Sequence, residues 1–260
     1  MNMRIACLAA LLCMVALGAD EAPNAAVELA PAAGTPVLSL ASSATDVLRV
    51  CRAMLPRGMV ELKGSMILRN RKGIVASEHD YRLVMRRSAE ASQLSIELSP
   101  RGETNMTARV TIARRGDARP EIRLTRGGAE TEVVDSLLAR VLETDVTWLD
   151  LTFDYLWWPD PFYETEREGE SVHGQVCSVI LVKPAHAVAG LSAVRLWVDK
   201  KTGCLMQIEQ VGEDGKPIRR MWGTRVKKFD GKWMVSVLEV ETLGSRHRTK
   251  ITVDAIREIN

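Results

Sequence analysis

The second half of the chain alternates short strand-like segments with turns of only a few residues. Asp-Gly occurs in two of these turns, at 214–215 and 230–231, and supplies the positive φ that tight hairpins need. Because such short connections can join only antiparallel neighbours, successive strands must pair in chain order. We predict strands at 175–182, 193–198, 205–211, 217–227, 232–241 and 248–256.

The first half has a similar rhythm. Around 60–69, Val60, Leu62, Met66 and Leu68 alternate with charged or polar residues, which is a period of two with one apolar face. Further strands are predicted at 77–85, 93–98, 108–113 and 121–124. A sheet of about eleven strands should curl, as in a partly closed barrel. The fold class we predict is α+β, a long curled antiparallel sheet (half β-barrel) with helices on its concave face.

Helical spacing interrupts the strands in three places. Residues 42–55 read as a helix with Ser43 or Thr45 as the N-cap, Asp46 in the first turn, and one apolar face. Val133, Leu137 and Val141 predict a second helix over 132–143. The apolar segment 148–158 continues it, and Pro159 ends it.

The N-terminus reads as an export signal. Arg4 precedes an apolar run of 13 residues at 5–17, which is too short to span a membrane comfortably. We expect residues 1–18 to be a signal peptide, cleaved before Ala19, and residues 19–41, rich in Ala and Pro, to be a flexible segment. Residues 42–260 would then be one domain in the periplasm. Cys13 lacks the small preceding residue of a lipidation site, so a soluble form is favoured.

Three cysteines remain after such cleavage: Cys51, Cys177 and Cys204. An odd number in an oxidising compartment permits at most one intramolecular disulfide. The sequence leaves open whether two of them pair or all three are buried thiols. None lies in a CxxC pair, so a zinc site is not predicted.

Charge and motifs argue against several function classes. The net charge is +2, from 35 basic and 33 acidic residues, so the excess typical of nucleic-acid binders is missing. No GxSxG, Walker, GxGxxG or HExxH motif occurs, and the four His residues are scattered. We therefore predict no catalytic residues, no metal, no cofactor and no enzyme activity. A hydrolase with a non-standard site is the remaining enzyme alternative.

Some charged residues have two interpretations. Asp150, Asp154 and Asp160 could form a carboxylate group, although helix caps and surface positions explain them more simply. Basic doublets recur at strand ends, where edge protection and solubility are the default role and attraction to anionic lipid is the alternative. These doublets are Arg86-Arg87, Arg114-Arg115, Arg219-Arg220 and Lys227-Lys228.

Aromatic residues are concentrated in one segment. Of 12, seven lie between Trp148 and Tyr163, and only Tyr81 precedes them. One interpretation is a plain core between helices and sheet, and the other is an apolar cavity that takes an acyl chain. The candidate lining residues are Met66, Leu68, Trp148, Leu151, Phe153, Leu156, Trp157, Trp158, Leu196, Trp197, Met206, Met221 and Trp222.

Several segments in order resemble a known family. They are DLTFDYLWWP at 150–159, GQVC at 174–177, VRLWVDKKTG at 194–203, DGKWM at 230–234 and RHRT at 246–249. Together they resemble the outer-membrane lipoprotein-sorting proteins of the LolA/LolB-like superfamily, over residues 42–257 and most strongly from 145. The resemblance implies an eleven-stranded half-barrel with a helical lid. It also implies a periplasmic carrier that shields acyl chains of lipoproteins or lipids, with sorting components of the two membranes as further partners and peripheral membrane contact at most.

In that family an Arg on an early strand bonds to the lid backbone. Arg82, Arg86 and Arg87 lie in the corresponding strand, and no motif selects one of them. The alternative function is a periplasmic sensor or adaptor that uses the same fold to bind a membrane-anchored protein. A cavity of several hundred Å³ would fit the carrier, and a packed interior would favour the adaptor.

Overall fold

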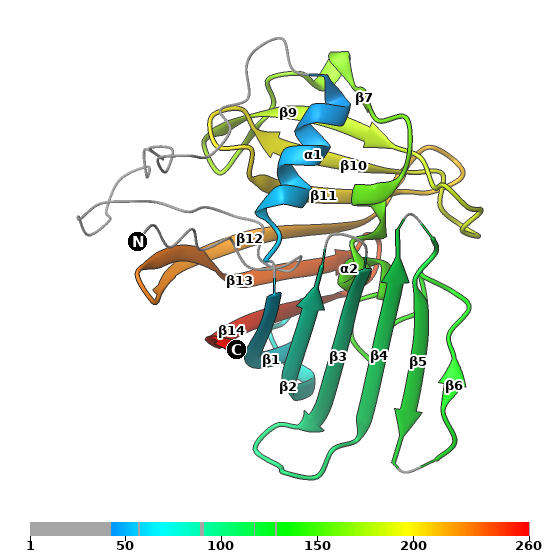
Figure 1. The fold of residues 1–260 in the computed structure, drawn as a ribbon, viewed down its shortest axis with the longest axis vertical. Coiled ribbons are helices and arrows are strands. Elements are labelled where there is room, and N and C mark those ends of the chain that lie inside the picture. The colour runs from blue at the N-terminus through cyan, green and yellow to red at the C-terminus, as the bar shows by residue number, and fades with distance from the viewer. Residues whose placement is uncertain (1–42, 57, 89–90, 117, 128, 260) are drawn as a thin grey trace.

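The strands form one continuous antiparallel sheet. The computed structural model describes residues 43–259 except 57, 89, 90, 117 and 128, so the predicted signal peptide and flexible segment lie outside the described residues. Within them, 14 strands follow the order β6-β5-β4-β3-β2-β1-β14-β13-β12-β11-β10-β9-β7, with β8 paired to β9. The first and last long strands, β1 and β14, therefore pair in the middle (Figure 1).

All eleven predicted strands are present, and three two-residue strands too short to show a period of two were missed. The strands are β1 (Gly58–Asn70), β2 (Val75–Arg87), β3 (Ala91–Pro100), β4 (Ala108–Arg115), β5 (Glu121–Arg126), β6 (Glu132–Val133), β7 (Phe162–Tyr163), β8 (Ser171–Val172), β9 (Gln175–Val182), β10 (Ala193–Asp199), β11 (Leu205–Val211), β12 (Pro217–Phe229), β13 (Lys232–Thr242) and β14 (His247–Ile259). The helices are α1 (Ala44–Met54), α2 (Trp148–Thr152) and the 3₁₀ turns η1 (Asp154–Trp157) and η2 (Thr165–Arg167).

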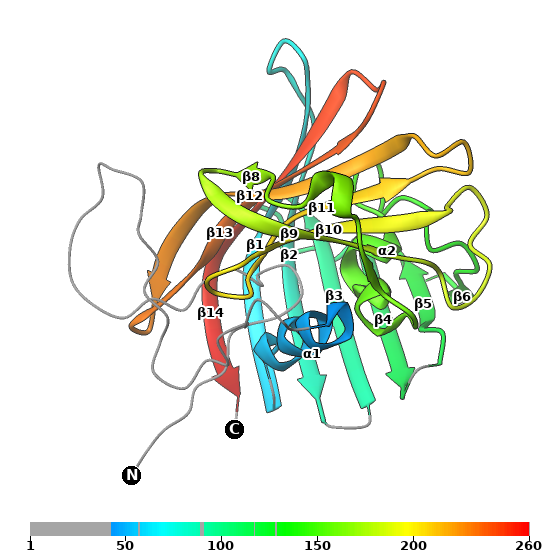
Figure 2. The same cartoon turned by 90° about the horizontal axis from the view of Figure 1, so that it is seen from above.

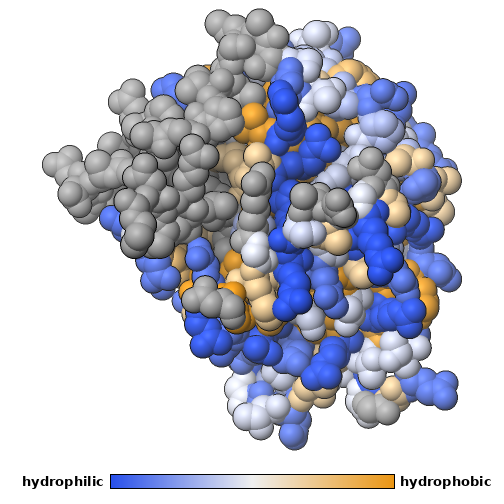
Figure 3. Space-filling model, in the orientation of Figure 1, coloured by the Kyte–Doolittle hydropathy of each residue, from blue (hydrophilic) through white to orange (hydrophobic). Residues whose placement is uncertain are grey.

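The sheet curls into a trough, with α1 and α2 inside the curve (Figure 2). The predicted α+β class and the curled antiparallel sheet with helices on its concave face are confirmed. Along each strand, side chains alternate between the concave face and the outer, convex face. The buried apolar cluster fills the space between the concave face and the helices. The face seen in Figure 3 is mostly hydrophilic, with smaller hydrophobic areas among it.

A close approach of strands shapes the centre of the sheet. The register between β1 and β14 shifts between Lys63 and Gly64. A Cβ at Gly64 would overlap the carbonyl oxygen of Thr252 on β14. That carbonyl accepts a hydrogen bond from Tyr81 Oη at 2.9 Å. Only glycine leaves room for this bulge, which adds local twist to the sheet.

Helix α1 begins as predicted. Ser43 is the N-cap, and its side chain and that of Asp46 form a capping box. At its other end, Arg87 Nη1 on β2 donates a hydrogen bond of 2.9 Å to the carbonyl of Arg52. Cys51 Sγ lies 3.5 Å from the carbonyl of Gly203, in the β10–β11 turn. The helix thus crosses the trough and contacts both halves of the sheet.

The helix predicted over 132–143 is wrong. The segment begins as β6 and continues as turns, with Leu142 at φ 52°. Its backbone finds partners elsewhere: Val134 N donates to Ile122 O, and Leu137 O accepts from Leu149 N. Leu137 is buried as a helix would have placed it, but its backbone belongs to a turn. Apolar residues four apart fit this arrangement as well as a helix, which explains the error.

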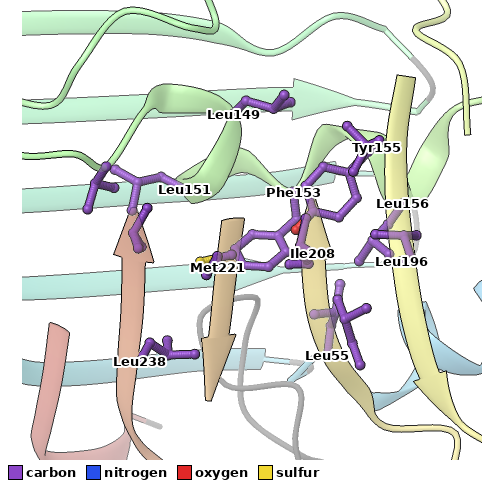
Figure 4. Packing of buried hydrophobic residues seen from close by; sticks show 14 of the residues in the cluster. Leu55, Leu149, Leu151, Phe153, Tyr155, Leu156, Leu196, Ile208, Met221 and Leu238 are labelled. Carbon is purple, nitrogen blue, oxygen red and sulfur yellow. The ribbon is translucent and has the colours of Figure 1, made fainter. Parts of the chain in front are cut away.

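The segment 148–158 is helical but broken. Phe153 adopts φ 50°, which ends α2 and starts η1. At this left-handed residue the chain turns, and Figure 4 shows the side chains of Phe153 and Tyr155 among the buried residues of the strands. Within the described part of the chain, none of the helices has the length and apolar content of a membrane-spanning segment.

Candidate functional site

A buried ion pair anchors the segment that covers the concave face. Arg219, on β12, is 6% exposed and faces inward with Met221. Its Nη2 donates a 2.8 Å hydrogen bond to Asp150 Oδ2 and also bonds to the backbone carbonyl of Asp145. Gln210 Nε2 on β11 donates to Asp150 Oδ1 at 2.8 Å. The same carboxylate caps α2 through the backbone N–H of Thr147, at 2.7 Å.

Two further strands bind Asp145, which lies two residues before the N-cap of α2. Its backbone N–H donates to Thr249 Oγ1 at 2.7 Å, from β14. Thr242 Oγ1, on β13, lies 3.0 Å from Asp145 Oδ1 and 2.8 Å from Arg219 Nη1. The start of α2 is therefore bonded to β11, β12, β13 and β14. Two atoms of this network, Gln210 Oε1 and Arg219 Nε, are buried without a hydrogen-bond partner in the described structure, so the network is satisfied only in part.

This network was not found from the sequence. The doublet Arg219-Arg220 was interpreted as surface charge, and Asp150 as a cap or surface residue. Asp150 is indeed a cap, but it is buried. The sequence could have predicted that Arg219 faces inward, because residues two apart on a strand point to the same face and Met221 points to the interior.

The early-strand arginines have other contacts. Arg82 is on the convex face, where its Nε lies 2.7 Å from Glu61 Oε1. Arg86 contacts the sulfur of Met59. Arg87 bonds to the backbone of α1, so it alone of the three holds a covering element.

A cationic and aromatic rim lies beside η1. The guanidinium carbon of Arg114, on β4, is 3.3 Å from the ring centroid of Trp157, and that of Arg87 is 5.6 Å away. Next to them, Trp158 Nε1 donates to Asp154 Oδ2 at 2.9 Å. Burial raises the pKa of the Asp154 carboxyl, and the bond from Trp158 opposes that rise.

Most predicted lining residues are packed together in the concave interior. Nine of them belong to the buried cluster on that side, namely Met66, Trp148, Leu151, Phe153, Leu156, Trp158, Leu196, Met206 and Met221, and Trp197 is a tenth buried member that lies on the convex side. Trp157 is half-buried at its margin, and Leu68 is buried near the end of β1. Figure 4 shows Phe153 and Leu156 close to Leu196 and Met221. These residues form an apolar contact between cover and sheet.

Trp197 and Trp222 are not where the sequence interpretation placed them. Each follows an inward-facing residue, Leu196 or Met221, so it points to the convex side. There both line a groove of about 370 Å³. Trp197 Nε1 donates to Glu170 Oε2 at 2.9 Å, and the Arg248 guanidinium is 4.9 Å from the Trp222 ring centroid.

A ladder of alternating charges runs across the convex face beside this groove. Arg195 on β10 pairs with Glu164 and with Glu209 of β11. Glu209 also pairs with Arg220 of β12 at 3.1 Å. On β14, Arg248 pairs with Glu239 at 2.6 Å and Glu241 at 3.1 Å, both from β13.

Three cysteines lie in the part of the chain that the structure describes, and each is buried. They are Cys51, Cys177 and Cys204, and none of these described residues forms a disulfide. Burial raises the pKa of Cys51 and of Cys177 to about 12, so both remain thiols. Among the described residues, no three His, Cys, Asp or Glu side chains gather closely enough to hold a metal ion.

Comparisons with known proteins support the fold. A family model described as an uncharacterized protein matches residues 135–258. No curated protein matches the chain. A DUF1329 family protein from Desulfovibrio piger superposes with a TM-score of 0.71 at 16% identity, covering 83% of this chain and 91% of that one.

Two further solved structures are similar. A domain assigned as an outer membrane lipoprotein-sorting protein, from Vibrio parahaemolyticus, has a TM-score of 0.66 at 15% identity, covering 77% of this chain and 85% of its own. A LolA superfamily protein from Nitrosomonas europaea has a TM-score of 0.63 at 15% identity, covering 85% and 95%. The chain therefore has the LolA-like fold, and the resemblance stated from its sequence is confirmed at the level of fold.

Proposed function

We propose that the protein binds acyl chains of lipids or lipoproteins in its concave interior and carries them through the periplasm toward the outer membrane. The observation that carries this proposal is the cover of the concave face. An apolar wall of strands is closed by short helical pieces, not by a second sheet. Moving such a piece exposes a continuous apolar trough. The role is binding, and no catalytic step is proposed.

The piece best suited to move is α1. Hydrogen bonds join it to the sheet at its C-terminal end, where Arg87 donates to the carbonyl of Arg52 and Cys51 Sγ donates to the carbonyl of Gly203. In contrast, α2 is bonded to four strands through Asp145 and Asp150. We infer that α2 and η1 stay in place as one wall of the site while α1 lifts away.

The free energy gained by burying α1 is similar to the free energy gained by burying an acyl chain. The buried side chains of α1 and its C-cap include four aliphatic ones, namely Val47, Leu48, Val50 and Leu55. At about 1.5–3 kcal/mol each, they hold the helix with roughly 6–12 kcal/mol. A chain of fourteen methylenes gains about 0.8 kcal/mol per CH₂, or roughly 11 kcal/mol. An acyl chain can therefore replace α1 in a nearly balanced and reversible exchange, which suits a carrier.

The rim suits the polar end of such a ligand. When α1 leaves, Arg87 exchanges the carbonyl of Arg52 for the ester or phosphate group of the lipid. Arg114 remains on Trp157 at the same edge. The signal peptide at 1–18, the flexible segment at 19–41 and the single domain at 42–260 belong to this proposal, because export is required for it.

Lipid extraction and probe binding test the proposal. Organic extracts of the purified protein, examined by mass spectrometry, should contain acyl lipid, and a fluorescent fatty acid should bind. Leu48→Ser, which weakens the packing of α1 against the sheet, should increase probe binding. Arg49→Ala, at an exposed position of the same helix, should not. Lack of lipid in the extract, with no probe bound by either the wild type or Leu48→Ser, would refute it.

A second candidate is the adaptor. The observation that favours it is the packed interior beside an open convex groove that contains Trp222. In this case the groove binds an extended segment of a membrane-anchored protein. Trp222→Ala should then abolish capture of one defined partner and leave the lipid content unchanged, whereas capture that survives Trp222→Ala would contradict this role.

A further inference from the structure

Two hairpin tips meet at the open end of the central strands. The β1–β2 and β13–β14 hairpins project side by side beyond the body of the sheet (Figure 2). The backbone N–H of Arg71 donates to the carbonyl of Arg246 at 2.9 Å, which ties the two turns together. Between the hairpins lies a pocket of about 560 Å³, within the size range of small-molecule sites.

The pocket is strongly basic. Five cationic residues line it, together with His247: Arg69, Arg71, Arg246, Arg248 and Lys250. Its two acidic residues, Glu239 and Glu241, already pair with Arg248. The site therefore carries an excess of positive charge in a protein that is close to neutral as a whole.

One pair of these cations is placed unfavourably. Arg69 of β1 lies directly opposite Arg248 of β14 in the strand register. Like charges at opposed positions of an antiparallel pair are destabilising. Within the part of the chain that the structure describes, no acidic side chain forms an ion pair with Arg69. Arg248 is already paired with Glu239 and Glu241, so the cation that an anion would pair with here is Arg69, and phosphate matches a guanidinium well.

Apolar side chains project next to this charge. Ile74 is 60% exposed and Val75 is 44% exposed, and both belong to the β1–β2 hairpin. Exposed aliphatic residues beside a basic cluster are typical of surfaces that meet an anionic membrane. A soluble anion would need the cations but not the aliphatic pair.

We propose that this pocket binds the phosphate group of an anionic phospholipid headgroup, with Ile74 and Val75 against the leaflet surface. Arg69 pairs with the phosphate, and Arg71, Arg246 and Lys250 surround it. The site lies apart from α1 and from the concave interior, so it does not depend on acyl-chain carriage. It gives the protein a defined end with which to meet a membrane.

Vesicle co-sedimentation tests this site. The probe is phosphatidylcholine vesicles with and without phosphatidylglycerol, and the variant is Arg69→Gln/Arg71→Gln/Arg246→Gln. At about 1 kcal/mol for each basic residue near an anionic surface, the triple variant should bind phosphatidylglycerol vesicles on the order of a hundredfold more weakly. Arg225→Gln/Lys227→Gln/Lys228→Gln removes the same charge from exposed positions of β12 and should change binding less than about threefold.

Two further measurements separate the sources of phosphate. Ile74→Ser/Val75→Ser should weaken vesicle binding and leave the NMR response of the arginine side chains to inorganic phosphate unchanged. Equal losses in the two triple variants would show general charge attraction and overturn the proposal. Inorganic phosphate that perturbs Arg69 while no vesicle binds would assign the pocket to a soluble anion and overturn the membrane source. Circular dichroism confirms that each variant is folded.

Discussion

The guanidinium of Arg219 lies 2.8 Å from the carboxylate of Asp150, where β12 meets the first turn of α2 inside the trough. Both side chains are almost fully buried, and each has additional hydrogen bonds. The pair fixes where the covering segment sits on the sheet. That position decides which elements of the cover can move and which cannot.

Removing one member of this pair should be costly. Arg219→Met leaves the Asp150 carboxylate buried without its cation, so we expect the free energy of unfolding to fall by about 3–5 kcal/mol in a urea titration. Arg225→Met, an exposed site on the same strand, should change it by less than about 0.5 kcal/mol. The double variant Arg219→Met/Asp150→Asn should recover part of the loss. Equal stability of Arg219→Met and Arg225→Met would show that the pair does not hold the cover.

Glu61 should contribute a pH-dependent part of the stability. Arg82 and Arg257 lie 2.7 and 2.6 Å from its carboxylate and hold its pKa at about 2, below the ordinary 4.5. Because the folded-state pKa is the lower one, this stabilisation is complete above about pH 5 and is lost as the pH falls from 4.5 toward 2.

The difference in melting temperature between wild type and Glu61→Gln should therefore be several degrees at pH 7 and close to zero near pH 2. Glu103→Gln, at an exposed site between β3 and β4, should follow the wild-type curve at every pH. A constant difference between wild type and Glu61→Gln across this range would contradict the assignment.

Cys51 can report the movement of α1. In the closed structure its thiol is buried and has a pKa of about 12, so a variant with Cys51 as its only cysteine should resist maleimide labelling. A saturating fatty-acid probe should increase the labelling rate at least tenfold, because α1 lifts. A variant with only Cys177, which is buried on β9 away from α1, should stay protected. Protection of Cys51 while the probe is bound would show that α1 does not move.

Gly64 should not tolerate a side chain. Its added Cβ would overlap the Thr252 carbonyl and crowd Tyr81 Oη, so Gly64→Ala should lower stability by about 3 kcal/mol. Gly215→Ala, in a turn at φ +76° with open space around it, is the matched control and should lose about 1 kcal/mol from backbone strain alone. Thermal unfolding of the two variants distinguishes these costs, and equal losses would argue against the close approach at the bulge.

Turn chemistry and the period of two predicted the sheet because both act locally. Asp230 and Gly231, for example, adopt the positive φ values that the Asp-Gly turn predicted. The segment 132–143 failed because its backbone partners, such as Ile122 and Leu149, are set by tertiary packing that spacing alone does not show. Leu137 and Val141 are buried in a different backbone conformation, whereas Val133 is 56% exposed.

The candidate site was predicted in part. The aromatic segment 148–158 does cover a curved sheet, and most of its neighbours in the predicted lining meet there. Trp197 and Trp222 lie outside the concave interior in which the sequence interpretation placed them. Each directly follows another candidate, Leu196 or Met221, and adjacent residues of a regular strand point to opposite faces. Arg219 was missed because arginine is seldom buried, and only its place in the alternation revealed its direction.

The pairing of β1 with β14 has a consequence for the order of folding. Strands β1 and β14, the first and last of the described strands, join the two halves of the sheet through twelve register pairs. Neither half has its inner edge paired until both of these strands are present, so the central pairing closes the longest loop in the sheet and should form late in folding.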